Sequence, residues 1–374
     1  MVMDNEQDVI EAVERTIGIL RENLSQPMTL DELSRAASLS PRHYSRIFKQ
    51  LTGRSPIDYL IAQRVSRAKQ LLVSSDSSIH EIAGSIGFRD PFHFSRSFKQ
   101  HTGVSPKLYM KLRRNHVRIA SLQFLGELLA LGIKPVGAPS QLMKCGFYRH
   151  QIEGIEHIAQ TVVTPHIDRL SALKPDVIVT FNGHHYENYA RIAPTLDVAW
   201  SMPFFDRFRF IADWVGKSDT AEAWVESYLR NVSENKRMLQ EVIRDGHTVS
   251  FLWMRGLPAT FDVYYDMGVL YRDLGLRAPE PVRRVQLRKD HMFKEVVPVS
   301  ELSMHTGDYM FVVVSPDDES QAEFAALSRT SKWQELEAVK NGRCFLIGED
   351  WLREDPVSMM GQVQEAAMTI RSSG

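Results

Sequence analysis

Basic side chains recur at matching positions in two copies of one segment of the chain. Residues 45–59 read SRIFKQLTGRSPIDY and residues 95–109 read SRSFKQHTGVSPKLY, and ten of the fifteen positions are identical. Each copy places an Arg and a Lys on a segment that ends at Thr-Gly and Ser-Pro. Arg and Lys donate hydrogen bonds to phosphate oxygens and to the edge of guanine. The repeat therefore indicates a surface that could bind a nucleic acid at two places.

The segments around each copy indicate how these side chains would be positioned. Thr29 and Glu32 have the spacing of a capping box, and the apolar residues that follow predict a short helix. Pro41 then favours the start of a second helix, which should end at Gly53. The second copy repeats this plan over residues 78–109. Each unit is therefore expected to be a pair of short helices joined by a tight turn.

Two short helices with a tight turn form a helix-turn-helix unit, whose second helix enters the major groove of DNA. The expected DNA contacts are the residues of the second helices that lie off the apolar stripe. They are Arg42, His43, Ser45, Arg46 and Lys49 in the first unit, and Phe92, His93, Arg96 and Lys99 in the second. A connecting helix over residues 57–73 should hold the two units about 34 Å apart, on successive turns of one groove.

The basic residues are concentrated in one part of the chain. Residues 41–115 hold 14 Lys and Arg against 4 Asp and Glu, whereas residues 116–374 hold 28 against 34. The formal net charge of −1 hides this division. A local excess of positive charge is expected of a domain that binds phosphates. The alternative is an interaction domain whose basic residues form a solvated face, and two matching copies disfavour it.

A resemblance to the AraC-type DNA-binding domain is carried by Arg64 and by the segments SRIFKQLTGRSPIDYL and IHEIAGSIGFRDPFHFSRSFKQHTGVSPKLY. The likeness covers roughly residues 8–115 and implies a seven-helix module with two recognition helices, as used by bacterial transcription regulators. The residues that would face bases are Arg42, Ser45 and Arg46 in the first half-site, and His93 and Arg96 in the second. The DNA sequence stays open, because the family varies at these positions.

The remaining residues are expected to form one or two more domains, because 374 residues exceed one helical DNA-binding domain. The N-terminus MVMDNEQDVIEAVERTIGIL is acidic and amphipathic, unlike a signal peptide, and no apolar run reaches the roughly 18 residues of a membrane span. Cys145 and Cys344 are isolated from each other, which argues against a zinc site or a disulfide framework. We expect a cytoplasmic protein with no membrane partner.

From Val117 onward, strand-like and helical segments alternate, a pattern typical of α/β proteins. The predicted strands cover residues 117–120, 176–180, 248–253, 309–314 and 343–347. One helix, at about 218–245, keeps its apolar register long enough to span on the order of 40 Å. Such a helix could connect two lobes.

These segments resemble a second family, the substrate-binding proteins of iron-siderophore, haem and cobalamin importers. The likeness is carried by RIASLQFLGELLALGIKPVGAP, LSALKPDVIV, RIAPTLDVAW and the helix after WVGKSDTAEA. It implies two α/β lobes, at about 117–205 and 246–374, with ligand in the cleft between them. We therefore expect a multidomain chain. An all-α double helix-turn-helix domain at 1–115 precedes a two-lobed α/β substrate-binding-protein-like domain at 116–374 with a long interlobe helix.

A ferric siderophore would need cationic side chains on both walls of such a cleft. Catecholate and hydroxycarboxylate complexes of iron are bulky and usually anionic, so Arg and Lys would hold them and aromatic rings would line the space. The candidates lie in loops after predicted strands. They are Lys144, Tyr148, Arg149, His184, His185 and Tyr186 on the first lobe, and Arg255, Tyr264, Arg283, Arg284 and Arg288 on the second.

Other chemistries find little support in the sequence. His184 and His185 are adjacent, so they point apart in most backbones, and no third ligand is obvious; no metal site is expected. There is no phosphate-binding Gly-rich loop, no G-x-S-x-G motif and no H-E-x-x-H motif. Cys145 lies in a sequence unlike the cysteine box of DNA-repair alkyl acceptors that carry AraC-type modules. We expect neither an enzyme nor a bound cofactor.

The combined hypothesis is a ligand-responsive transcription activator. A ferric siderophore would bind between the lobes and change how the N-terminal domain engages double-stranded promoter DNA of siderophore-uptake genes, with RNA polymerase as an expected partner. Two alternatives stay open: a regulator that senses haem, cobalamin or another metabolite, and a cytoplasmic binding or storage protein that docks to an importer. The sequence leaves the ligand, the operator, the direction of regulation and the oligomeric state open.

Overall fold

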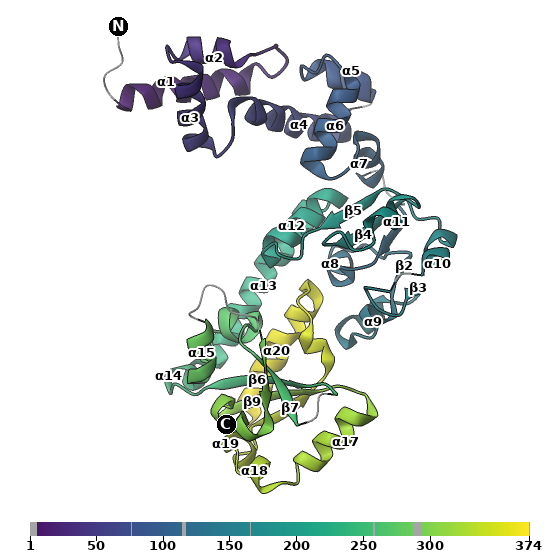
Figure 1. The fold of residues 1–374 in the computed structure, drawn as a ribbon, viewed down its shortest axis with the longest axis vertical. Helices are drawn as coiled ribbons and strands as arrows, with labels where there is room; N and C mark the ends of the chain where they lie inside the picture. The colour runs from purple at the N-terminus through teal and green to yellow at the C-terminus, as the bar shows by residue number, and fades with distance from the viewer. Residues whose placement is uncertain are drawn as a thin grey trace.

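The computed structural model describes residues 6–75, 77–113, 117–164, 166–256, 259–286 and 294–373. Two small helical units lie side by side at one end of the molecule, and the first and then the second α/β lobe follow along its long axis (Figure 1). The predicted order of an all-α domain and two α/β lobes is confirmed. None of the helices in these ranges is both long and apolar enough to cross a membrane.

The N-terminal part is helical throughout its described residues. The first unit contains α1 (Glu6–Glu22), α2 (Leu30–Ala36) and α3 (Pro41–Thr52). Helix α4 (Pro56–Ser74) connects it to the second unit, which contains α5 (Ile79–Ser85), α6 (Pro91–Thr102) and α7 (Pro106–Arg113). The predicted pair of helix-turn-helix units is therefore present, with α3 and α6 as the second helices.

Matching caps explain why the repeated sequence folds in the same way twice. Thr29 N donates to Glu32 Oε2 at 2.8 Å, and Ser78 N donates to Glu81 Oε2 at 2.7 Å, so both first helices begin with a capping box. Each second helix then begins with a proline behind a capping side chain and ends at a left-handed glycine. The predicted capping box and the predicted end at Gly53 are confirmed.

The first lobe is built on a parallel sheet of strand order β3-β2-β1-β4-β5. Its strands are β1 (Ile119–Ser121), β2 (Gly137–Pro139), β3 (Glu156–Ala159), β4 (Val177–Phe181) and β5 (Thr195–Val198). Its helices are α8 (Leu125–Ala130), α9 (Ser140–Met143), the 3₁₀ segment η1 (Gly146–Gln151), α10 (Ile167–Ala172), α11 (Tyr186–Ala190) and α12 (Phe204–Val215). The interior strand β4 is almost wholly buried, as expected of a parallel strand covered on both faces.

The second lobe has a mixed sheet of order β10-β9-β6-β7-β8, in which β7 runs antiparallel to both of its neighbours. Its strands are β6 (Val249–Met254), β7 (Thr260–Tyr264), β8 (Lys294–Pro298), β9 (Tyr309–Val314) and β10 (Cys344–Ile347). Its shorter helical segments are α14 (Gln240–Arg244), η2 (Val269–Asp273), α15 (Glu280–Gln286), η3 (Val299–Glu301), α16 (Leu302–His305), α17 (Asp318–Leu327), α18 (Ser331–Gln334), α19 (Glu337–Lys340) and η4 (Glu349–Leu352).

Two long helices join the lobes. Helix α13 (Ser218–Met238) leaves the first lobe and enters the second, and α20 (Pro356–Ser372) packs beside it and against α8 (Figure 1). A side chain at Gly126 on α8 would overlap the carboxylate of Asp355, which caps α20. The close approach of α20 to the first lobe therefore requires glycine at this position.

The interlobe helix is shorter than its apolar register predicted. Helix α13 has 21 residues and ends at Met238, which gives a length of about 32 Å instead of about 40 Å. Leu239 leaves helical geometry at φ −93° and ψ 9° and is fully buried in the core of the second lobe. A separate short helix, α14, follows. The helical spacing of apolar residues continues across Leu239 because the residues on both sides of the break pack on the same core.

One hydrophobic core crosses from the second helical unit into the first lobe. It joins Phe98 and Tyr109 of that unit to Phe208 and Trp214 of α12. The first helical unit has a separate core, which includes Tyr44. The second unit and the first lobe are thus packed together, whereas the first unit is attached through α4.

Candidate nucleic-acid interface and ligand cleft

Helices α3 and α6 bury one face and expose the other. Tyr44 and Phe48 fill the core side of α3, and Phe94 and Phe98 fill that of α6. The side chains predicted to contact DNA lie on the remaining surface. Exposed are Arg42, Arg46, Lys49, Phe92, His93, Arg96 and Lys99, and half-buried are His43 and Ser45. Phe92 is 79% exposed, which is unusual for a large apolar side chain on the surface of a protein.

The side chain of Arg64 holds the two helical units in a fixed relation. Its Nε donates to Leu24 O and its Nη2 donates to Gln26 O, both at 2.8 Å, so it is tied to the loop between α1 and α2 of the first unit. Its guanidinium also lies 5.6 Å from the ring centre of Phe88 in the second unit. Burial lowers the pKa of Arg64, and these carbonyls and the ring replace part of its hydration.

A cavity of about 850 Å³ lies between the two lobes. The first lobe lines it with Gln141, Lys144, Gln160, Thr161 and Trp200. The second lobe lines it with Trp253, Tyr264, Asp266, Met267, Gly268, Val269, Arg272, Lys294, Met359, Gln362 and residues 349–354. This volume suits a bulky small molecule, and the lining combines indole rings with charged groups.

The charges around this cavity are balanced among the described lining residues. The cations are Lys144, Arg272, Lys294 and Arg353, and the carboxylates are Asp266, Glu349, Asp350 and Glu354. Each wall thus carries a cation, Lys144 on the first lobe and three on the second, but an equal number of carboxylates accompanies them. Three of the carboxylates come from the segment after β10, which the sequence reasoning did not consider.

A buried carboxylate orients the cations at the wall of the second lobe. Asp262 accepts hydrogen bonds from Arg255 Nε and Lys294 Nζ, both at 2.6 Å, and is 2% exposed. The Lys294 ammonium lies 4.6 Å from the ring centre of Trp253 and 5.5 Å from that of Tyr264. Burial raises the pKa of Tyr264, so its phenol stays neutral. Lys294 is thus fixed over an aromatic wall that faces the cavity.

Polar contacts join the lobes at the edge of the cavity. Gly146 N of η1 donates to Asp350 Oδ2 at 2.8 Å, and the guanidinium of Arg353 donates to Gln141 O. Asp350 and Arg353 belong to the second lobe, and Gly146 and Gln141 belong to the first. Two residues that line the cavity therefore also hold the lobes together.

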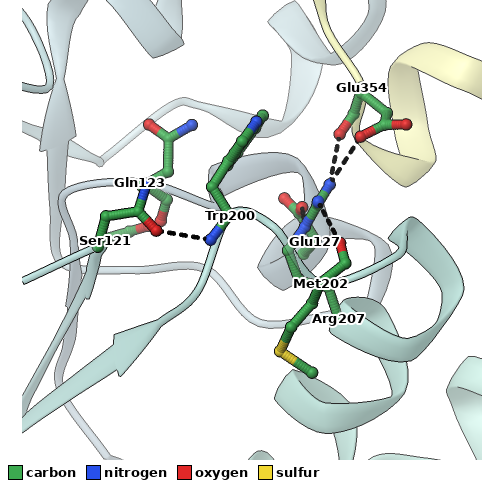
Figure 2. Close-up of polar contacts among 8 residues, drawn as sticks. Ser121, Gln123, Glu127, Trp200, Met202, Arg207 and Glu354 are labelled. Carbon is green, nitrogen blue, oxygen red and sulfur yellow. Dashed lines mark hydrogen bonds and ion pairs between the residues drawn. The ribbon is translucent and has the colours of Figure 1, made fainter. Parts of the chain in front are cut away.

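A buried guanidinium makes a third link between the lobes. Arg207 on α12 is 1% exposed and lies between Glu127 of α8 and Glu354 of the second lobe (Figure 2). Its Nη2 is 3.2 Å from both the main-chain O and the Oε2 of Glu354, whereas its Nε is 3.5 Å from Glu127 Oε1. The guanidinium carbon also lies 4.5 Å from the ring centre of Trp200.

The carboxyl of Glu127 is the weakly bonded member of this cluster. Its Oε1 has no hydrogen-bond partner among the described residues. Burial, together with the nearby carboxylate of Asp355, raises the pKa of Glu127 to about 8 despite the attraction of Arg207, while Glu354 acts in the same direction as Asp355. Burial also raises the pKa of Asp355. The cluster therefore takes up protons when the protein folds near neutral pH.

The Glu127→Gln variant is expected to lose much of the pH dependence of stability between about pH 5 and pH 8. The folded protein keeps the Glu127 proton in this window while the unfolded chain releases it, so stability of the wild type falls as pH rises. The variant should be the more stable protein at pH 9 by a few kcal/mol, at about 1.4 kcal/mol per pKa unit. Urea denaturation at pH 5, 7 and 9 measures both quantities.

The control for this experiment is Glu222→Gln. Glu222 is exposed and pairs with Arg209 of α12, and the hydrogen bond from Arg209 lowers the pKa of Glu222. Glu222→Gln should therefore leave the slope between pH 5 and pH 8 unchanged. Asp355 acts in the same direction as Glu127, so some slope should remain in Glu127→Gln. An undiminished slope in Glu127→Gln would show that its carboxyl is ionised in the folded protein.

The structure places the predicted ligand residues at several sites. Lys144 and Tyr264 line the cavity. Arg255 lies beside the cavity, where its guanidinium pairs with the carboxylate of Asp262. Tyr148 is buried in the first lobe, where its hydroxyl donates to Leu142 O, and Arg149 is exposed on η1. Arg283 and Arg284 pair with Glu280 on α15. Arg288 lies outside the described residues.

The predicted residues after β4 do not line the cavity. His185 Nε2 is 3.1 Å from Val163 O, and the ring of His184 lies 4.7 Å from that of Phe181. Tyr186 lines a groove of about 330 Å³ where Lys99 and α7 meet the first lobe. In the described ranges no group of three or more His, Cys, Asp or Glu side chains is placed to hold a metal ion.

Several residues that line the cavity were missed in the sequence. Trp200 follows β5, and Glu349 and Asp350 follow β10, so the rule that selected Arg255, a position just after a strand, could have found them. Lys294 begins β8, a strand that was not predicted. Arg272 lies on the helical segment η2, and no predicted strand ends just before it, so the same rule does not select Arg272.

Two family models match the chain. A helix-turn-helix domain model matches residues 33–112, and a periplasmic binding protein model matches residues 159–351. The first runs from within α2 to α7, and the second covers parts of both lobes.

Curated relatives combine or separate the same two parts. The HTH-type transcriptional activator Btr of Bacillus subtilis is 26% identical over 365 residues, a match that covers 93% of this chain and 66% of Btr. The iron(3+)-hydroxamate-binding protein YxeB of the same organism is 26% identical over 258 residues, covering 66% of this chain and 77% of YxeB. The chain therefore spans slightly less than two thirds of the relative that shares both parts.

Solved structures share the fold of the two lobes. A FhuD fold-family component of a Fep/Fec-like ferrichrome transporter from Bacillus subtilis has a TM-score of 0.61 at 24% identity, covering 68% of this chain and 94% of that one. FhuD2 of Staphylococcus aureus with bound ferrioxamine B has a TM-score of 0.60 at 19% identity, covering 69% and 99%. With its family model matching more than half of the residues, the chain belongs to the periplasmic binding protein family, and it carries an AraC-type helix-turn-helix domain ahead of that part.

Proposed function

We propose that this chain is a cytoplasmic transcription activator that responds to a ferric siderophore and controls genes for iron-siderophore uptake. The observation that carries the proposal is the union, in one chain, of two exposed basic recognition helices and a two-lobed cleft of about 850 Å³. The ligand would bind in the cleft, and double-stranded promoter DNA would bind α3 and α6. RNA polymerase would be the protein partner at the promoter.

The proposal for DNA rests on the surface of α3 and α6. Arg42 and Arg46 on α3 and Arg96 on α6 are exposed and make no ion pair with any described residue. Guanidinium groups in this state can form bidentate contacts with guanine or bind phosphates. The transcriptional activator Btr, which matches 93% of the chain, supports the same assignment.

The proposal for the ligand rests on the shape and lining of the cavity. Trp200, Trp253 and Tyr264 supply broad apolar surfaces from both lobes, as a bulky chelate requires. The balanced charge of the described lining favours an iron chelate of low net charge over a highly anionic one. YxeB, named for iron(3+)-hydroxamate binding, and FhuD2 with ferrioxamine B support this class of ligand.

The Trp253→Ala variant is expected to weaken binding of the siderophore about 10- to 100-fold, because a central aromatic wall carries much of the affinity of such a site. Trp253→Phe keeps the wall but loses the hydrogen bond from Nε1 to Ser315 Oγ, at 2.9 Å, and should lose less than tenfold. Leu346→Ala, at an exposed position outside the cavity, is the control. Calorimetry measures each Kd, and equal affinities in all three variants would remove Trp253 from the site.

The proposal is tested by calorimetric titration of the purified full-length protein. The panel contains ferrichrome, ferrioxamine B and iron-loaded staphyloferrin B, their iron-free forms, haem and cobalamin. Submicromolar binding of one iron-loaded siderophore, with weaker binding of its iron-free form, is the expected result. Binding of only haem or cobalamin would support the alternative regulator, and absence of binding to the whole panel would remove the siderophore assignment.

A further inference from the structure

One end of α12 contacts both walls of the ligand cavity. Arg207 touches Trp200 of the first lobe and Glu354 of the second, and both of these residues line the cavity. Arg207 itself is buried, and it does not line the cavity. Its position is therefore set by two groups that a ligand would touch directly.

The other end of α12 contacts the DNA-binding domain. The carboxylate of Asp213 forms an ion pair with the ammonium of Lys69 on α4. Helix α4 is the connection between the two helix-turn-helix units, and it also carries Arg64. In addition, Trp214 and Val215 of α12 belong to the hydrophobic core that includes α6 and α7.

We expect helix α12 to move as a rigid body, because it is closely packed between Arg207 and Asp213. Arg207 and Asp213 are six positions apart, which is about 9 Å along a helix. Between them, Phe208, Ile211 and Ala212 are fully buried. A close-packed helix of this kind transmits a displacement of one end to the other, because its side chains cannot deform independently.

We propose that α12 couples the ligand cleft to the spacing of the two helix-turn-helix units, with Arg207 as the positioning residue at the cleft and the Asp213–Lys69 pair as the contact at the DNA-binding domain. This inference rests on the proposed function. When a ligand moves Glu354 or Trp200, Arg207 must follow, because a buried guanidinium that loses its carboxylate is strongly disfavoured. The shift of α12 then changes the orientation of α4, and with it the relation between α3 and α6.

A double-mutant cycle on DNA affinity tests this coupling without requiring the ligand to be known. Glu354→Gln removes the charge at the cleft end but keeps an amide oxygen that can accept from Arg207, and the main-chain O of residue 354 stays in place, so the fold should tolerate it. Lys69→Met cuts the contact at the DNA end. The probe is a duplex selected in vitro for binding by the wild-type protein. Glu354→Gln should change the Kd for this duplex about three- to tenfold in the wild-type background and less than twofold in the Lys69→Met background.

Controls separate coupling from general damage. Glu222→Gln removes a carboxylate that pairs with Arg209 on the exposed face of α12, and it should leave the Kd unchanged. Reversing the pair, with Lys69→Asp and Asp213→Lys together, should restore the response to Glu354→Gln. An equal effect of Glu354→Gln in both backgrounds would overturn the role of the Asp213–Lys69 pair, and no effect in either would overturn the role of α12. Failure of the selection to enrich any duplex would instead overturn the proposed function.

Discussion

Replacing both Arg46 and Arg96 with alanine is expected to weaken specific DNA binding by about 100- to 10,000-fold. Each arginine is exposed on a recognition helix, and loss of one base-reading arginine typically costs about 1–3 kcal/mol. Because the residues occupy equivalent positions of the repeat, the two losses should add when the units address separate half-sites. Fluorescence anisotropy with a selected duplex measures the Kd of each variant.

The matched control replaces Arg230 and Arg237 on α13. This variant has the same change in net charge, but α13 runs between the two lobes and not in the helix-turn-helix units (Figure 1). It should therefore weaken DNA binding less than threefold. The salt dependence of the Kd should also become shallower only in the Arg46 and Arg96 variant. Equal losses in the two double variants would mean that net charge, and not the recognition helices, drives DNA binding.

The Gly87→Ala variant is expected to lose about 2–4 kcal/mol of stability in the DNA-binding domain and most of its DNA affinity. Gly87 lies in the turn of the second unit at φ +88°, a conformation that disfavours alanine. A Cβ there would also lie 2.6 Å from Leu24 O and 2.7 Å from Arg64 Nη2. The substitution should therefore displace the arginine that ties the two units together. Urea denaturation and DNA anisotropy measure the two effects.

Gly53→Ala separates backbone strain from this clash. Gly53 has a similar φ of +73°, but a Cβ there would meet no atom within 4 Å. We expect a loss of about 1 kcal/mol and nearly intact DNA binding. Ligand binding should persist in both variants, because no residue of α4 lines the cleft. Equal effects of Gly87→Ala and Gly53→Ala would show that the contact with Arg64 does not matter.

Local sequence signals predicted the DNA-binding domain because its determinants are local. The capping boxes, the prolines and the left-handed glycines each act within a few residues, so the pattern alone indicated where α2, α3, α5 and α6 begin or end. The strand β9 was predicted with its observed bounds, because six consecutive apolar residues rich in valine leave little ambiguity.

The ligand cleft was harder to predict because its residues meet only through tertiary contacts. Trp200 and Glu354 are far apart in sequence, and no spacing pattern connects them to Arg207 or to each other. The break at Leu239 also escaped notice, since a buried leucine continues the apolar register whether or not the helix does. Tyr148 was chosen as a ligand contact for its loop position, yet the structure buries it.

The central claim is that ligand and DNA influence each other through this chain. The direct test is the Kd of the selected duplex with and without saturating iron-loaded siderophore from the titration panel, together with the Kd of that siderophore with and without duplex. We predict that both values change by one common factor of about 5–150, because coupling free energy is reciprocal. Tight binding of both partners with neither Kd changed by the other would contradict the account.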